Sequence, residues 1–148
     1  MKLTWAEVWR HPIESNFLSC FSDDFGERVK RLLITDEASH LLVVYSVSPE
    51  FAKITLRPVG DGDVLKLSIR GRASPCLDPA VVKLVTNLAS RVRLVHATGF
   101  VCVGDEFAYE AYVFKETSET FQFEQFKAVE NLPAVENVEV ELVTSRGA

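Results

Sequence analysis

Two segments near the middle of the chain alternate between apolar and polar residues. Side chains on a β-strand point to opposite faces in turn, so residues 51–57 and 64–70 each predict a strand with one apolar face. Between them lies Gly60-Asp61-Gly62-Asp63, a composition typical of a turn. The sequence therefore predicts a hairpin with Ile54 and Leu67 on its buried side.

The other face of this predicted hairpin is basic. Its side chains are one aromatic ring, two hydroxyls and five cations: Phe51, Lys53, Thr55, Arg57, Lys66, Ser68, Arg70 and Arg72. Lysine and arginine bind phosphates, hydroxyl groups support them, and single-stranded bases stack on aromatic rings. The face predicts a site for single-stranded nucleic acid. The alternative is an ordinary solvated face of a half-buried antiparallel sheet.

Two helices are predicted before this hairpin. Thr4 and Glu7 have the spacing of a capping box, which predicts a short helix that ends by Pro12. A second helix is expected from about residue 24 to residue 34, capped by Asp24. The stretch 14–21 has a mixed pattern that leaves helix and strand open.

The remaining elements follow from turn and cap signals. Residues 41–47 are apolar on both faces, which predicts a central strand, and Asp78-Pro79 predicts the start of a helix that ends near Ser90. Further strands are expected at 92–95, 100–103, 107–114 and 138–142, the last of them at a sheet edge because its glutamates alternate outward. Residues 119–126 fit either a helix or a strand.

These elements predict a single α+β domain over residues 1–148. We expect a mostly antiparallel sheet with helices packed on one face. The predicted core consists of Trp5, Val8, Val29, Leu32, Val43, Ile54, Leu56, Leu67, Leu84 and Leu88.

Composition narrows the class of protein. No apolar run approaches the ~20 residues that cross a bilayer, and charged residues interrupt the N-terminus where a signal peptide needs an apolar stretch. The three cysteines are widely spaced and do not suggest a disulfide framework. We therefore expect a cytoplasmic protein. The few glutamines and the single methionine resemble a thermophile's composition.

The net charge of −5 is unevenly distributed. Residues 1–103 contain 13 basic and 11 acidic side chains, whereas residues 104–148 contain 3 basic and 10 acidic ones. A local basic stripe can therefore bind anions although the whole chain is acidic. The alternative is that the acidic third is simply a solvated surface.

The sequence offers little for catalysis or for metal binding. The histidines and cysteines lack the close pairs of a zinc site, and Cys76 has no histidine near it in the sequence to act as a base. Gly60 and Gly62 precede a strand rather than a helix, which argues against a dinucleotide loop. We expect a protein that is not an enzyme and needs no metal or cofactor.

Two protein families resemble this chain at the level of architecture. The basic and aromatic face, the chain length and the composition are similar to the non-OB single-stranded DNA-binding proteins of thermophilic crenarchaea (ThermoDBP-like), which implies DNA binding across that face. The order of helices and strands over residues 24–115, with Leu84–Leu88 followed by Gly99-Phe100 and a hairpin, resembles the YbjN and type III secretion chaperone-like fold. That resemblance implies a homodimer that binds a protein or peptide.

Self-association is also expected from the residues themselves. Residues 138–142 offer a sheet edge, and residues 104–132 carry seven aromatic rings that are hard to bury in one small domain. The sequence thus predicts a homodimer or higher homo-oligomer. Its function is expected to be sequence-independent binding of single-stranded nucleic acid, DNA or RNA, with peptide binding as the alternative.

Overall fold

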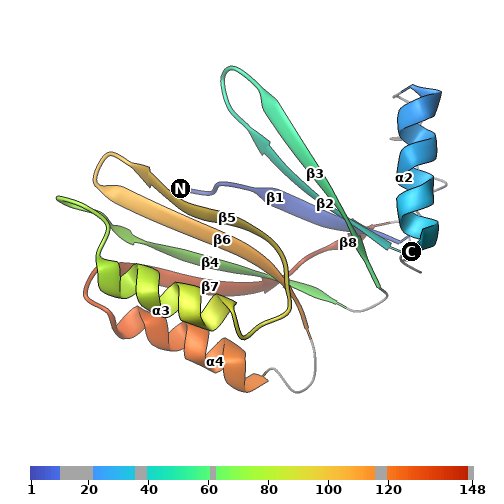
Figure 1. The fold of residues 1–148 in the computed structure, drawn as a ribbon. Helices are drawn as coiled ribbons and strands as arrows, with labels where there is room; N and C mark the ends of the chain where they lie inside the picture. The colour runs from blue at the N-terminus through green and yellow to red at the C-terminus, as the bar shows by residue number, and fades with distance from the viewer. Residues whose placement is uncertain (11–21, 36–39, 61–62, 116–119, 147–148) are drawn as a thin grey trace. The chain divides into compact units, whose positions relative to one another are not determined.

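The structure is a computed structural model, and it describes residues 1–10, 22–35, 40–60, 63–115 and 120–146. The elements in chain order are β1 (Trp5–Trp9), α2 (Asp23–Thr35), β2 (His40–Val47), β3 (Ala52–Val59), β4 (Val64–Arg72), α3 (Pro79–Ala89), β5 (Leu94–Val103), β6 (Glu106–Phe114), α4 (Thr120–Ala128), η3 (Val129–Asn131), β7 (Val135–Leu142) and β8 (Ser145–Arg146) (Figure 1). They form an α+β fold, which confirms the predicted class.

The chain divides into two compact units. The first unit combines Met1–Leu3 with Asp63–Leu142, and the second combines Thr4–Gly62 with Val143–Ala148. Each unit contains one four-stranded sheet.

The first unit is a sheet covered on one face by two helices. Its strand order is β5-β6-β4-β7, and all three neighbouring pairs are antiparallel. Helices α3 and α4 lie side by side against the same face of this sheet (Figure 1). The predicted strand 138–142 is confirmed as part of β7, at one edge of the sheet.

The core of this unit forms between the helices and the odd-numbered residues of β4 and β6. The sheet contributes Leu65, Leu67, Ile69, Phe107, Tyr109, Ala111 and Val113, and the helices contribute Val81, Val85, Leu88, Phe126 and Val129. All of these side chains are buried. Burying each large one contributes about 1.5–3 kcal/mol, so this cluster is the main stabilising feature of the unit.

A local signal defines the start of helix α3. Asp78 Oδ1 accepts a hydrogen bond of 2.9 Å from the Ala80 amide, and Pro79 takes the first helical position, as the sequence predicts. Residues 120–128 form a helix, which settles that part of the ambiguous stretch 119–126. The other ambiguous stretch, 14–21, lies outside the described residues.

Gly71 occupies a position where β4 and the start of β7 approach closely. The Arg72 amide donates to the Ala134 carbonyl over 2.8 Å, and the pairing register shifts between Arg70 and Gly71. A Cβ atom at Gly71 would overlap the Ala134 carbonyl oxygen and lie 2.7 Å from Phe107 Cε1. Only glycine fits here without a shift of the backbone.

The second unit contains the other sheet and helix α2. Its strand order is β3-β2-β1-β8, with β1 and β8 parallel and the other pairs antiparallel. Val29 of α2 is buried in a cluster with Trp9, Leu41 and Val43, and Leu56 packs against this cluster. The predicted strand 41–47 is confirmed as β2, between β3 and β1.

The predicted N-terminal helix is wrong, because residues 5–9 form strand β1. Trp5, Val8 and Trp9 fit helical spacing in so short a segment, but pairing with β2 satisfies the backbone instead. The helix predicted from about 24 to 34 is confirmed as α2. Its start differs, since Ser22 Oγ accepts from the Phe25 amide over 3.3 Å. Asp24 instead forms an ion pair of 3.0 Å with Arg28.

The predicted hairpin between residues 51–57 and 64–70 is also wrong. Both segments are strands, but β3 pairs with β2 in the second unit, and β4 pairs with β6 and β7 in the first. A turn composition signals that the chain changes direction, and it does not say with which strand the next segment pairs.

The predicted core is confirmed in most of its described members. Five predicted residues are buried: Val8, Val29, Val43, Leu67 and Leu88. Leu56 and Leu84 are partly buried, whereas Trp5 and Ile54 are exposed and the prediction for them is wrong. The side chain of Leu32 lies outside the described part of the chain.

Burial of Tyr109 predicts a loss of stability at alkaline pH. Its ring lies in the core, and the centres of the Tyr109 and Phe100 rings are 5.0 Å apart. Burial raises the pKa of the Tyr109 phenol above its usual range. The neutral phenol therefore contributes to the free energy of unfolding. This contribution is fully present below the pKa of tyrosine in the unfolded chain, about 10, and it is lost as the pH rises through the pKa of Tyr109 in the folded protein.

We therefore expect the free energy of unfolding of the wild type to fall above about pH 10, and Tyr109→Phe to flatten that fall. Urea unfolding at neutral and alkaline pH measures both slopes. Tyr45→Phe, which removes an exposed phenol, is the control. Equal alkaline slopes for Tyr109→Phe and the wild type would contradict the expectation.

Candidate functional site

The residues of the predicted nucleic-acid face are divided between the two units. Phe51, Lys53, Thr55 and Arg57 lie on β3 or just before it, in the second unit. Lys66, Ser68, Arg70 and Arg72 lie on β4, in the sheet of the first unit. The eight residues therefore belong to two sheets.

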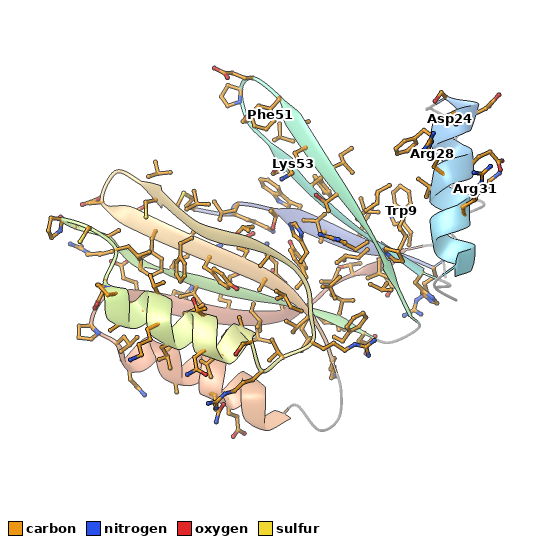
Figure 2. All side chains as sticks on the ribbon, in the orientation of Figure 1. Trp9, Asp24, Arg28, Arg31, Phe51 and Lys53 are labelled. Carbon is orange, nitrogen blue, oxygen red and sulfur yellow. The ribbon has the colours of Figure 1, made fainter. Side chains whose placement is uncertain are left out.

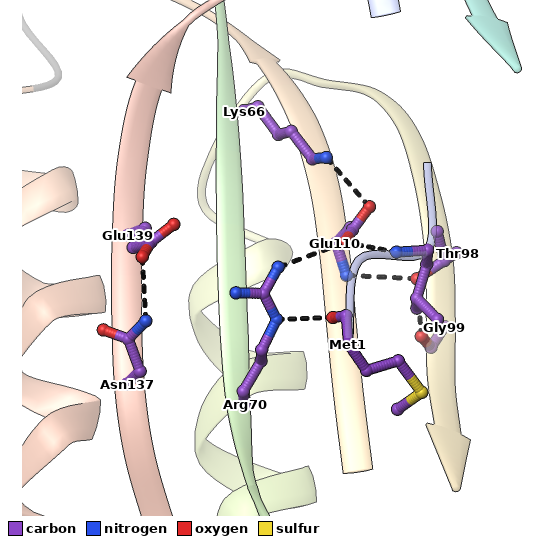
Figure 3. Close-up of polar contacts among 9 residues, drawn as sticks. Met1, Lys66, Arg70, Thr98, Gly99, Glu110, Asn137 and Glu139 are labelled. Atoms are coloured by element: carbon purple, nitrogen blue, oxygen red, sulfur yellow. Dashed lines mark hydrogen bonds and ion pairs between the residues drawn. The ribbon is translucent and has the colours of Figure 1, made fainter. Parts of the chain in front are cut away.

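The β4 half of the predicted face is occupied by protein contacts. Lys66 is only 4% exposed, and its Nζ lies 3.0 Å from Oε1 of Glu110, which is fully buried (Figure 3). Ser68 is buried as well. The prediction that these side chains face solvent is wrong. The alternation of apolar and polar residues correctly separates the two faces of β4, but it does not reveal that the polar side chains Lys66 and Ser68 are buried too.

Arg70 and Arg72 also have protein partners. Arg70 Nε donates to the Met1 carbonyl over 2.5 Å, and its Nη2 lies 3.8 Å from Oε2 of Glu110 (Figure 3). Arg72 pairs with Glu136 over 2.9 Å, and the hydrogen bond from Arg72 to that carboxylate raises the pKa of the arginine. Both cations are therefore partly neutralised by the protein itself.

Glu110 organises the face of the first sheet that points away from α3 and α4. In addition to Lys66 and Arg70 it accepts a hydrogen bond of 2.9 Å from the Leu3 amide. Its own amide donates to Thr98 Oγ1 over 3.0 Å. A carboxylate with this many donors is stabilised in place, so the cluster has the geometry of a structural ion-pair network.

The tyrosines that could extend an aromatic platform are buried. Tyr112 is fully buried, with the Lys66 ammonium 5.8 Å from its ring centre, and Tyr109 belongs to the core of the first unit. The two tyrosines lie on opposite faces of β6. Neither ring is available to stack on a base.

The β3 half of the predicted face is accessible. Phe51 is 63% exposed, and Lys53 and Arg57 are exposed as well, while Thr55 is half-buried. Figure 2 shows Phe51 and Lys53 near the end of the β2–β3 hairpin that is distant from α2. Neither Lys53 nor Arg57 forms an ion pair with a residue that the structure describes.

An exposed apolar patch lies on the same hairpin and on the neighbouring strand β1, and sequence analysis missed it. Trp5 and Tyr45 are each 39% exposed and stack with ring centres 6.2 Å apart and an interplanar angle of 18°, and Ile54 is 47% exposed. Strand pairing places Trp5 opposite Tyr45 and Tyr45 opposite Ile54, so the three share one face. Val47 extends this surface, and we call these four residues the hairpin patch.

The sequence gives only a weak signal for the hairpin patch. Its residues come from three strands, and each of them fits the apolar face of its own strand. They continue the face on which Trp9 and Val43 pack with α2, but they extend beyond that buried cluster. Only the pairing of distant segments reveals them as one exposed surface.

Strand β3 presents a free edge beside the hairpin patch. In the described ranges it pairs with β2 alone. The Ser48 amide donates to the Phe51 carbonyl over 2.8 Å, so these two residues form a hydrogen-bonded pair. Opposite residues of an antiparallel ladder alternate between hydrogen-bonded and non-hydrogen-bonded pairs. The N–H and C=O groups of Ala52, Ile54 and Leu56 therefore point away from β2. Pro58 has no N–H at the next outward position and closes the edge there.

The described part of the chain contains neither a cluster of metal ligands nor a helix that could cross a membrane. No group of three or more His, Cys, Asp and Glu side chains there could hold a metal ion. Among the described helices, none combines the length and apolarity that a bilayer crossing requires. Cys76 and Cys102 are exposed free thiols.

Comparisons with known proteins add no relative. No protein-family model and no curated protein matches this chain. The resemblances to the crenarchaeal DNA-binding proteins and to the chaperone-like fold therefore stay predictions, and the candidate site rests on its geometry.

Proposed function

We propose that this protein is a non-enzymatic binding module that accepts an extended peptide segment as an additional strand on the β3 edge. The observation that supports this most is the free edge at Ala52–Leu56 beside the exposed hairpin patch. An unpaired edge supplies main-chain hydrogen bonds, and the side chains on either face of it select the peptide.

The two faces beside this edge define the chemistry of the peptide. On one face Ile54 and Tyr45 offer apolar contact, and on the other Lys53 and Arg57 offer positive charge. No carboxylate belongs to β3 itself. A peptide strand whose residues alternate between apolar and acidic would place its apolar side chains beside Ile54 and its acidic side chains beside Lys53 and Arg57.

Binding of a labelled synthetic peptide that alternates valine and glutamate tests the proposal. Fluorescence anisotropy is expected to detect binding by the wild type, and a peptide of the same composition in scrambled order is expected to bind more weakly. Ile54→Pro removes an outward N–H without breaking the β2–β3 hydrogen bonds, and we expect it to abolish binding. Ile54→Ala retains that N–H and separates the contribution of the side chain.

Two results would overturn the proposal. One is an absence of peptide binding by the folded wild type. The other is equal affinity for the wild type and a folded Ile54→Pro variant, which would mean that the β3 edge takes no part.

Single-stranded nucleic acid is the second candidate ligand for the same hairpin. The observation that favours it is the exposed group of Phe51, Lys53 and Arg57, whose two cations have no ion-pair partner among the described residues. Phosphate binding depends steeply on salt, and stacking contributes about 1–3 kcal/mol per base.

Labelled oligo-dT at two salt concentrations distinguishes the two ligands. Under the peptide proposal oligo-dT binds weakly or not at all. Tight binding that falls steeply with salt, and is lost in Lys53→Glu/Arg57→Glu, would favour nucleic acid instead. Lys66 is left unchanged in this variant because its buried pair with Glu110 would be disrupted.

A further inference from the structure

Strand β7 is a regular edge of the sheet in the first unit. The sheet of the first unit has β5 and β7 at its two edges. β5 has register shifts between Leu94 and His96 and between Ala97 and Phe100, and Gly99 adopts a positive φ of 73°. Such bulges protect an edge from pairing. β7, in contrast, pairs with β4 without a shift from Asn137 to Leu142.

The side chains of β7 complement those of β3. Val138 and Val140 pack toward the helices, whereas Glu139 and Glu141 are exposed on the opposite face. β3 likewise has Ile54 and Leu56 on one face and Lys53 and Arg57 on the other. If β3 paired with a β7 strand, the apolar residues of the two strands could share one face. The two cations of β3 would then share the other face with the two carboxylates of β7.

Pairing of like edges is unfavourable. Two β3 strands would gather two copies each of Lys53 and Arg57 on one face, with no carboxylate from either strand. Two β7 strands would gather two copies each of Glu139 and Glu141. Like charges on neighbouring strands destabilise a pair, so the charge pattern favours β3 with β7 over both symmetric alternatives.

We infer that β7 of a second copy of this chain is a strand that the β3 edge accepts. The inference rests on the proposed function and names a partner for it. Each copy carries one β3 edge and one β7 edge. Two copies in which each β3 edge pairs with the β7 edge of the other form a closed dimer. If each copy pairs its β3 edge with one neighbour and its β7 edge with another, the copies form a larger assembly.

A pair of charge-reversed variants tests the inference. Lys53→Glu/Arg57→Glu makes both edges of one variant acidic, and Glu139→Lys/Glu141→Lys makes both edges of the other basic. Each variant alone is expected to be a monomer, whereas the wild type and the equimolar mixture of the two variants show at least twice the chain mass of 16.6 kDa in light scattering. Circular dichroism confirms that each variant is folded.

Matched controls carry the same charge changes away from the edges. Lys83→Glu/Lys127→Glu and Glu124→Lys/Glu130→Lys alter exposed side chains of α3, α4 and η3. Both are expected to associate as the wild type does. A monomeric wild type at high concentration, or variants that associate as strongly alone as in the mixture, would overturn the inference.

The peptide assay separates this inference from the proposed function. A peptide with the sequence of residues 136–142, Glu-Asn-Val-Glu-Val-Glu-Leu, is added to labelled wild-type protein. If the alternating valine–glutamate peptide binds but the chain stays monomeric and the 136–142 peptide does not bind, the inference fails and the proposed function stands. If neither peptide binds, both fail.

Discussion

Replacing Glu110 with alanine is expected to lower the free energy of unfolding by about 3–5 kcal/mol. The carboxylate is fully buried and lies 3.0 Å from the ammonium of Lys66, which is itself buried. Its removal leaves a positive charge in the interior without the carboxylate that balances it. The Leu3 amide loses an acceptor at 2.9 Å in the same variant.

Removing both charges should recover most of that loss. A buried ion pair gains little over well-packed apolar residues, so Lys66→Met/Glu110→Leu is expected to be far more stable than Glu110→Ala. Urea unfolding of the wild type and the variants measures the differences. A loss below about 1 kcal/mol for Glu110→Ala would mean that Lys66 does not depend on this carboxylate.

Replacing Phe126 with alanine is expected to cost about 3–5 kcal/mol, because the side chain is fully buried and its loss leaves a cavity. Phe126 belongs to the cluster that joins α3 and α4 to the sheet. The segment continues through η3 into β7, and the Val135 amide donates to the Leu132 carbonyl over 3.0 Å. The substitution should therefore also weaken the start of β7.

Urea unfolding tests this expectation against two other substitutions. Phe126→Leu retains most of the apolar volume and should lose less, and Lys127→Ala, at an exposed neighbouring position, should change stability by no more than about 0.5 kcal/mol. If Phe126→Ala and Lys127→Ala were equally stable, α4 would not be anchored through this ring.

The elements with local signals could be predicted from the sequence. The Asp78-Pro79 cap and the apolar stripe of Val81, Val85 and Leu88 describe α3 completely, because everything that specifies its start lies within a few residues. The alternation in β3, β4 and β7 likewise identified three strands. The N-terminal strand was missed because its five residues are too few to separate helical from strand spacing.

Strand pairing explains why the candidate site was only half predicted. Lys66 and Lys53 carry the same pattern of apolar neighbours, yet Lys66 lies beside Glu110, 44 positions further along the chain, and Lys53 has no such partner among the described residues. The hairpin patch depends equally on contacts between distant segments. The seven aromatics of residues 104–132 illustrate the same limit, since Phe107, Tyr109, Tyr112 and Phe126 are all buried within the chain.

The interleaving of the two units along the sequence constrains how the protein can be shortened. The second unit takes Val143–Ala148 as well as Thr4–Gly62, and β8 supplies the parallel partner of β1. A gene fragment that encodes residues 4–62 alone would leave the backbone of Val8 without the Thr144 carbonyl that it bonds at 2.9 Å. A minimal version of the second unit must therefore include the C-terminal residues too, either fused through a linker or brought next to residues 4–62 by circular permutation.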